Sequence, residues 1–139
     1  MGEIDRRRRC LEQACGLAAA LTASWDAFDL LRAICQQSGH GSHELFAAYA
    51  FAAQAAAQGR TIIRAAPSLP AGHGAETGAG ECVPDDLDEL ADELAGLARV
   101  LHGCLASAAR EAPDPVDGAA CADAAIQAAL VCELLAGDR

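Results

Sequence analysis

Apolar residues recur at every third or fourth position over most of the chain, the spacing that places side chains on one face of a helix. No segment alternates apolar with polar residues as a half-buried strand does. The pattern predicts an all-α protein whose helices cover residues 5–38, 42–65, 85–112 and 117–136.

The first two predicted helices follow each other closely. An apolar stripe runs from Cys10 to Cys35, with a bend expected near Ser24, and the glycines around residue 40 end the helix. Ser42 is expected to cap the second helix. Its predicted inner face consists of Leu45, Phe46, Tyr49, Ala53, Ala56 and Ile63.

The third predicted helix carries the most regular pattern in the chain, a heptad repeat typical of a helix–helix seam. Its members are Leu87, Leu90, Leu94, Leu97, Leu101, Cys104 and Ala108. Two prolines around residue 114 end it, and Asp117 is expected to cap the fourth helix. The predicted inner face of that helix consists of Ala119, Ile126, Leu130 and Leu134.

Short connections at 39–42 and 113–116 favour antiparallel neighbours. We therefore predict an antiparallel, up-down-up-down four-helix bundle, one domain over residues 1–139, with a long Gly-rich loop over 67–84. The leucine seam leaves an alternative, in which two helical hairpins dimerise into a larger bundle. On either arrangement we expect the chain to self-associate as a homo-oligomer.

Composition indicates a core built from small side chains. Hydrophobic residues make up 53% of the chain, but 35 of its residues are Ala and only 4% are aromatic. Such a core suits closely packed helices and disfavours strands.

Charge is distributed unevenly and narrows the classes of partner. Residues 1–80 hold seven acids and seven Arg, whereas residues 81–139 hold thirteen acids and three Arg, which accounts for the net charge of −10. Nucleic-acid binding is not expected, because the only basic stripe is Arg6–Arg9. No membrane contact is expected either, because no apolar run reaches the roughly 18 residues of a membrane helix. Seven Cys, an odd number, favour free thiols and a cytoplasmic location.

An acidic face at the start of the third predicted helix gives the leading functional hypothesis. Asp85, Asp88, Glu89 and Asp92 share one side of that helix. Clustered acids at i, i+3 and i, i+4 repel each other, so stability alone does not explain them. We expect a non-catalytic accessory protein that docks a basic protein partner there.

A second hypothesis is a soft-metal site at one end of the bundle. The predicted topology brings together Cys35, His40, His43, Cys104 and Cys121. Thiolates and imidazoles bind zinc or copper. No C-x-x-C pair is present, and packing explains a buried Cys equally well, so the cofactor prediction is none unless this cluster binds metal.

A third hypothesis is a pocket for a small apolar ligand between the first two predicted helices, where the aromatic residues gather: Trp25, Phe28, Phe46, Tyr49 and Phe51. Catalysis has weaker support. His43 and Glu44 could act as a general base and the group that orients it, but no nucleophile elbow, P-loop or dinucleotide fingerprint accompanies them.

Overall fold

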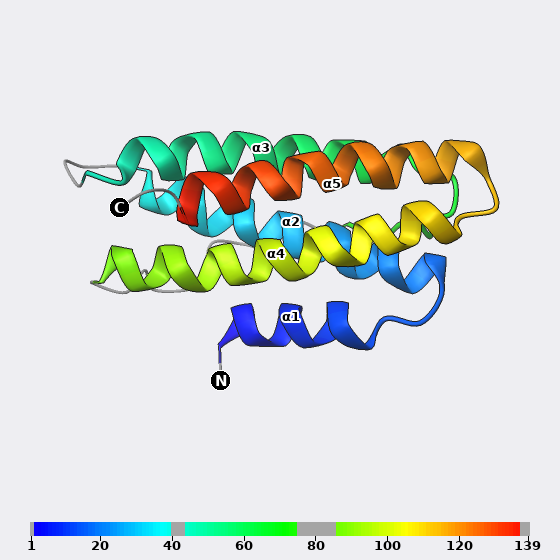
Figure 1. Ribbon diagram of the computed structural model, residues 1–139, viewed down its shortest axis with the longest axis horizontal. Helices are drawn as coiled ribbons and strands as arrows, with labels where there is room; N and C mark the ends of the chain where they lie inside the picture. The colour runs from blue at the N-terminus through cyan, green and yellow to red at the C-terminus, as the bar shows by residue number, and fades with distance from the viewer. Residues whose placement is uncertain (1, 40–43, 75–85, 137–139) are drawn as a thin grey trace.

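The computed structural model describes residues 2–39, 44–74 and 86–136, and within those ranges it contains five helices and no strand. The helices are α1 (Glu3–Gln13), α2 (Leu17–Ser38), α3 (Phe46–Arg64), α4 (Leu87–Glu111) and α5 (Pro115–Ala136) (Figure 1). They pack as a bundle, so the all-α prediction is confirmed.

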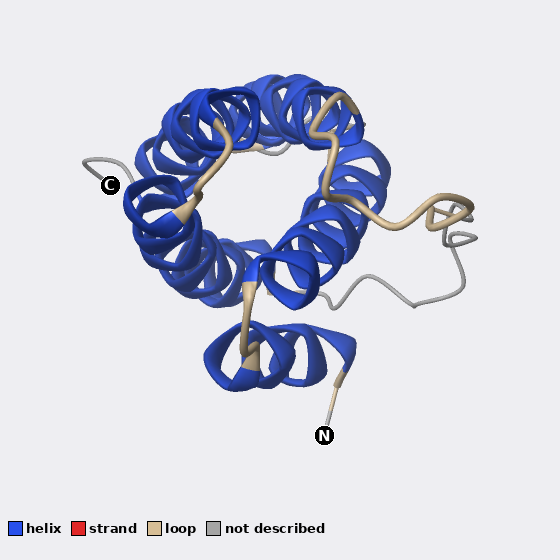
Figure 2. Ribbon diagram, turned by 90° about the vertical axis from the view of Figure 1, so that its right-hand side faces the viewer, coloured by secondary structure: helices blue, strands red, loops and turns tan. Residues whose placement is uncertain are grey.

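The predicted helix over 5–38 is in fact two helices. Ala14 adopts an extended conformation with ψ 124°, and Gly16 has φ +89°, a region that favours glycine. The chain reverses there, so α1 lies back along α2 and α4. Figure 2 shows α2–α5 as a ring seen end on, with α1 outside it.

The up-down-up-down order is also wrong. Figure 1 shows α2 and α5 running in one direction, and α3 and α4 in the other. The Tyr49 hydroxyl near the start of α3 donates to the Leu87 carbonyl at the start of α4, over 2.5 Å. The end of α3 instead lies near the start of α5, because Ser68 donates to Asp117. The order is therefore up-down-down-up, and residues 65–86 lead from one end of the bundle to the other.

Neighbours in the ring are nonetheless antiparallel. The contacts follow the order α2, α3, α5, α4 and back to α2, so α3 and α4 are diagonal partners. The leucine seam of α4 faces this interior: Leu90, Leu94, Leu97 and Leu101 are buried. The alternative in which this seam joins two copies is therefore not supported, because the seam already packs inside one chain.

Small residues set the distance between α2 and α3. A Cβ at Gly59 would lie 2.4 Å from the buried Phe28 ring, so only glycine lets the ring lie there. Ala52 and Ala56 are fully buried on the same side of α3. Phe46, predicted on this inner face, is instead 45% exposed.

The inner face of α5 differs from the predicted one. Ile126 and Leu130 are 64% and 41% exposed, and Ala119 is also exposed. The buried residues of α5 are Asp117, Ala120, Cys121, Ala124, Ala125, Ala128, Val131 and Leu135. Apolar residues occur on every side of this helix, so its sequence offers little contrast between the faces, and most of the side chains that lie inside are small.

The helix starts also differ from expectation in part. Asp86 caps α4 by accepting from the Glu89 backbone N–H at 3.0 Å, one position from the start predicted at residue 85. Asp117 does not cap α5. Its buried carboxylate accepts from the Ser68 backbone N–H and hydroxyl at 3.0 and 2.6 Å. Ser42 lies outside the described residues.

One described helix, α5, is long and apolar enough to cross a membrane by length and composition, with a mean hydropathy of 1.6 over its best window. The expectation that no segment reaches this length is therefore corrected. The criterion is also met by helices of protein cores, and α5 packs on both α3 and α4.

Candidate functional site

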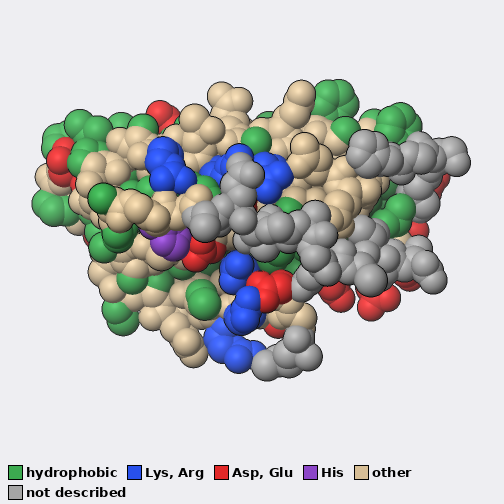
Figure 3. Space-filling model, turned by 180° about the vertical axis from the view of Figure 1, so that it is seen from behind, with side chains coloured by type: hydrophobic (Ala, Val, Ile, Leu, Met, Phe, Trp, Pro, Cys, Tyr) green, Lys and Arg blue, Asp and Glu red, His purple; other side chains and the backbone are tan. Residues whose placement is uncertain are grey.

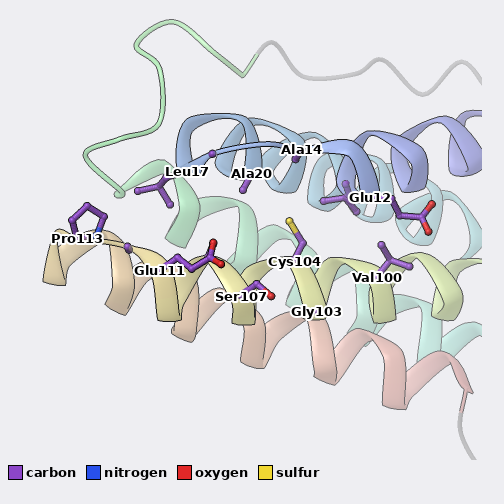
Figure 4. Close-up of a pocket in the computed structure, with 14 residues that line it drawn as sticks. Glu12, Ala14, Leu17, Ala20, Val100, Gly103, Cys104, Ser107, Glu111 and Pro113 are labelled. Carbon is purple, nitrogen blue, oxygen red and sulfur yellow. The ribbon is translucent and has the colours of Figure 1, made fainter.

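A cavity of about 550 Å³ lies where α1 and the start of α2 face α4 (Figure 4). On α4 its lining follows one face of the helix over three turns: Val100, Gly103, Cys104, Ser107, Ala108 and Glu111. These positions extend about 16 Å along the helix axis. The cavity is therefore elongated, and its volume lies in the usual range for small-molecule sites.

The cavity exists because small side chains line it. Gly103, Ser107 and Ala108 on α4 face Ala14 and Ala20 across the space. A Cβ built at Gly103 would meet no atom within 4 Å. Larger side chains at these positions would let α1 and α4 close the gap by direct packing.

The polar groups of the cavity are acidic or neutral. Glu12 and Glu111 are exposed carboxylates at its edge, the Ser107 hydroxyl lines the wall, and the Cys104 thiol lies between α4 and α2 (Figure 4). None of the described residues that line it is basic. The cavity therefore suits a neutral or positively charged ligand and disfavours an anion.

Two cysteines meet beside this cavity. Burial raises the pKa of the Cys104 thiol, and the neighbouring Ser24 hydroxyl opposes the shift. Burial also raises the pKa of Cys121 to about 11, and Asp117 and Cys104 add to the increase. Both thiols are therefore protonated near neutral pH and react slowly as nucleophiles.

The predicted metal ligands do not form one cluster in the part of the chain that the structure describes. Cys35 lies eleven residues beyond Ser24 on α2, about 16 Å along the helix from the neighbour of Cys104. Cys35 is fully buried, and burial raises its pKa to about 12. His40 and His43 lie outside the described residues. No group of three or more metal-binding side chains occurs among the described residues.

The aromatic residues do not form the predicted ligand pocket. Trp25, Phe28 and Tyr49 are buried in the core, whereas Phe46 and Phe51 are 45% and 60% exposed. Three of them therefore face the core and two face away from it, so the five do not line one space.

The acidic face of α4 is exposed, and helix α1 packs on the same helix. Asp88, Glu89 and Asp92 are exposed, and Asp85 lies outside the described residues. The Arg-rich α1 packs on α4, and the Arg8 guanidinium lies beside Gly96, one turn beyond Asp92. Figure 3 shows basic and acidic side chains side by side on the lower part of the rear face, where α1 lies.

A polar cluster that the sequence analysis did not identify joins α2 and α3. The fully buried Asp29 carboxylate accepts from Arg60 at 2.6 Å and from Arg32 at 3.2 Å. Its position on the apolar stripe, next to Phe28, was the available signal, because a buried carboxylate needs a cation.

Around Trp25 the cluster holds the start of the connection to α4. The guanidinium carbons of Arg60 and Arg64 lie 5.6 and 5.1 Å from the Trp25 ring centre. His73 meets the Trp25 ring edge-on and lies 2.9 Å from the Asp26 carboxylate. Arg64 also donates to the His73 carbonyl at 2.6 Å. These contacts fasten residues 65–74 to the bundle.

Comparison of the chain with protein families, curated proteins and solved structures found no match in any of the three.

Proposed function

We propose that the protein is a binding bundle for a small, elongated apolar molecule that is neutral or carries a positive charge. The cavity between α1, α2 and α4 carries this proposal. Its volume suits a small ligand, its walls are mainly apolar, and its few polar groups could orient one end of the molecule.

The charge of the edge defines the ligand class. Glu12 and Glu111 would attract a positively charged group and repel a carboxylate or a phosphate. A net charge of −10 acts in the same direction at longer range. An alkyl chain with a cationic head therefore fits the site better than a fatty acid.

The docking hypothesis for the acidic face stays a prediction. Asp88, Glu89 and Asp92 are accessible to a basic partner, but α1 already brings four consecutive Arg to the same helix. A basic partner would compete with α1 for this face. The cavity is the more specific feature, so the ligand proposal takes precedence.

A matched pair of amphiphiles tests the proposal. We expect dodecyltrimethylammonium to displace the apolar dye Nile red from the protein, and dodecyl sulfate to displace it less, each used below its micelle-forming concentration. Binding of the ammonium compound should also slow alkylation of Cys104, read by peptide mass, because this thiol lines the cavity.

Two variants at one position provide the control. Gly103→Trp should fill the cavity and abolish dye binding, whereas Gly103→Ala adds one methyl group, should keep binding, and should stabilise α4 by about 1 kcal/mol. Dye binding that survives in Gly103→Trp would show that the cavity is not the site. Equal displacement by both amphiphiles would overturn the charge assignment.

A further inference from the structure

The large apolar side chains exposed on the described part of the molecule all belong to two neighbouring helices. They are Phe46 and Phe51 on α3, and Val116, Ile126 and Leu130 on α5. These helices contact each other and lie together along the upper edge of the molecule in Figure 1. Of these five, Phe51 and Leu130 line one depression between the two helices, and adjoining exposed apolar side chains are typical of an interaction surface.

A groove of about 830 Å³ lies between these two helices. Phe51 and Ile62 on α3 and Leu130 and Leu134 on α5 form its apolar part. The other lining residues are Ala, Gln and Thr, and none of the described lining residues is charged. We call this surface the α3/α5 groove.

We infer that a second copy of this chain docks on the α3/α5 groove. Two copies with a net charge of −10 repel each other over most of their surfaces. Residues 46–58 of α3 carry no charge at all. The lining of the groove is uncharged as well, so two copies can bring these linings together without placing charged side chains in direct contact.

The same face holds both a projection and a depression, which a twofold contact requires. Phe51 is 60% exposed at the edge of the groove, and Leu130 is 41% exposed on the other side. In a twofold pair, Phe51 of each copy enters the groove of the other. Aromatic side chains that fill a pocket carry most of the binding energy in such contacts.

A lipid surface is the competing occupant, because α5 is apolar enough to be considered for a membrane. Helices that lie on membranes usually present Lys or Arg on their polar side. Helix α5 has neither, and its exposed charged residues include the acids Asp123 and Glu133. Anionic lipids would repel it, so the charges favour a second copy.

Sedimentation equilibrium tests the inference on the full chain. We expect a dimer that Phe51→Ser with Leu130→Ser weakens about 100-fold, while circular dichroism stays unchanged. Val116→Ser is the matched control, since this side chain is 57% exposed but does not line the groove. Added sodium chloride should strengthen the dimer, because it screens the repulsion between the two copies.

Three results would overturn the inference: a wild-type chain that is a monomer at every concentration, a dimer that tolerates the double substitution, or a monomer that sediments with phosphatidylcholine vesicles through this face. Ligand binding by Gly103 variants is measured separately, so the two proposals fail independently.

Discussion

Asp29 shows how one buried charge joins two helices. Its carboxylate has no exposed surface, and both of its Arg partners keep a small fraction in solvent, 16% and 18%. The two guanidinium groups can therefore reach water if the carboxylate is lost, whereas the carboxylate cannot reach water if they are lost.

We expect Asp29→Asn to lower the free energy of unfolding by about 2–3 kcal/mol. This loss lies near the lower limit for breaking a buried ion pair, because both Arg side chains stay partly hydrated. Urea denaturation followed by circular dichroism measures this. Asp123→Asn, at an exposed position of α5, should change stability by less than about 0.5 kcal/mol. Equal effects of the two substitutions would contradict the structural role of Asp29.

The buried Cys35 thiol should make the free energy of unfolding fall at alkaline pH. Burial raises its pKa from 9.0 to about 12, so above pH 9 the unfolded chain loses this proton while the folded chain keeps it. The folded state then binds more protons, and the free energy of unfolding falls as pH rises, by up to about 1.4 kcal/mol per pH unit.

Urea denaturation of the wild type and of Cys35→Ala measures this effect. Values from about pH 8 to about pH 11 cover most of the range in which the unfolded chain loses the proton and the folded chain keeps it. The variant should lose stability less steeply across this interval, whatever its stability at neutral pH. Cys10→Ala removes an exposed thiol and should keep the wild-type slope. A Cys35→Ala slope equal to that of the wild type would show that the thiol titrates normally in the folded state.

At the scale of the element, α1 is the helix most weakly attached. Leu11 is its one buried residue and Ile4 is partly buried, while four consecutive Arg make up its centre. Its contact with α4 therefore buries few apolar groups, and we expect the opposite charges of the two helices to contribute to it. Leu11 and Glu12 of α1 line the cavity together with Cys104, so we expect the attachment of α1 to control access to this thiol.

We expect Asp88→Arg with Asp92→Arg to speed alkylation of Cys104 severalfold, because these substitutions replace attraction to the Arg of α1 with repulsion. High salt should speed the reaction in the wild type for the same reason. Alkylation of Cys35 serves as the internal control, since this thiol is fully buried and does not line the cavity. Parallel acceleration of Cys35 would indicate general unfolding.

The elements also show where sequence reasoning works. In α4, leucines on one side contrast with acids on the other, and both its extent and its buried face follow from that contrast. In α5 the Ala-rich sequence lacks contrast, so the wrong face was predicted. The break between α1 and α2 rests on Gly16, which interrupts no apolar period.

At the scale of the whole molecule, the all-α bundle was predictable, but the helix order was not. Up-down-up-down and up-down-down-up orders both make every neighbouring pair antiparallel, so helix pattern alone does not distinguish them. The cavity was not predictable either, because it depends on side chains that fail to meet across α1, α2 and α4. The incorrect helix order also placed Cys35 at the same end as Cys104.

Because α3 and α4 are diagonal partners that start at the same end of the bundle, the length of residues 65–86 determines which helix order the chain can adopt. The end of α3 and the start of α4 are separated by about 30 Å, the length of a helix such as α3, which roughly 10 fully extended residues would just cover. With a shorter tether, α4 would have to start where α3 ends and point the other way. The present core could then form only by domain swapping, in which two chains exchange helical hairpins. The length of this tether thus decides whether one chain can close the cavity between α1, α2 and α4 by itself.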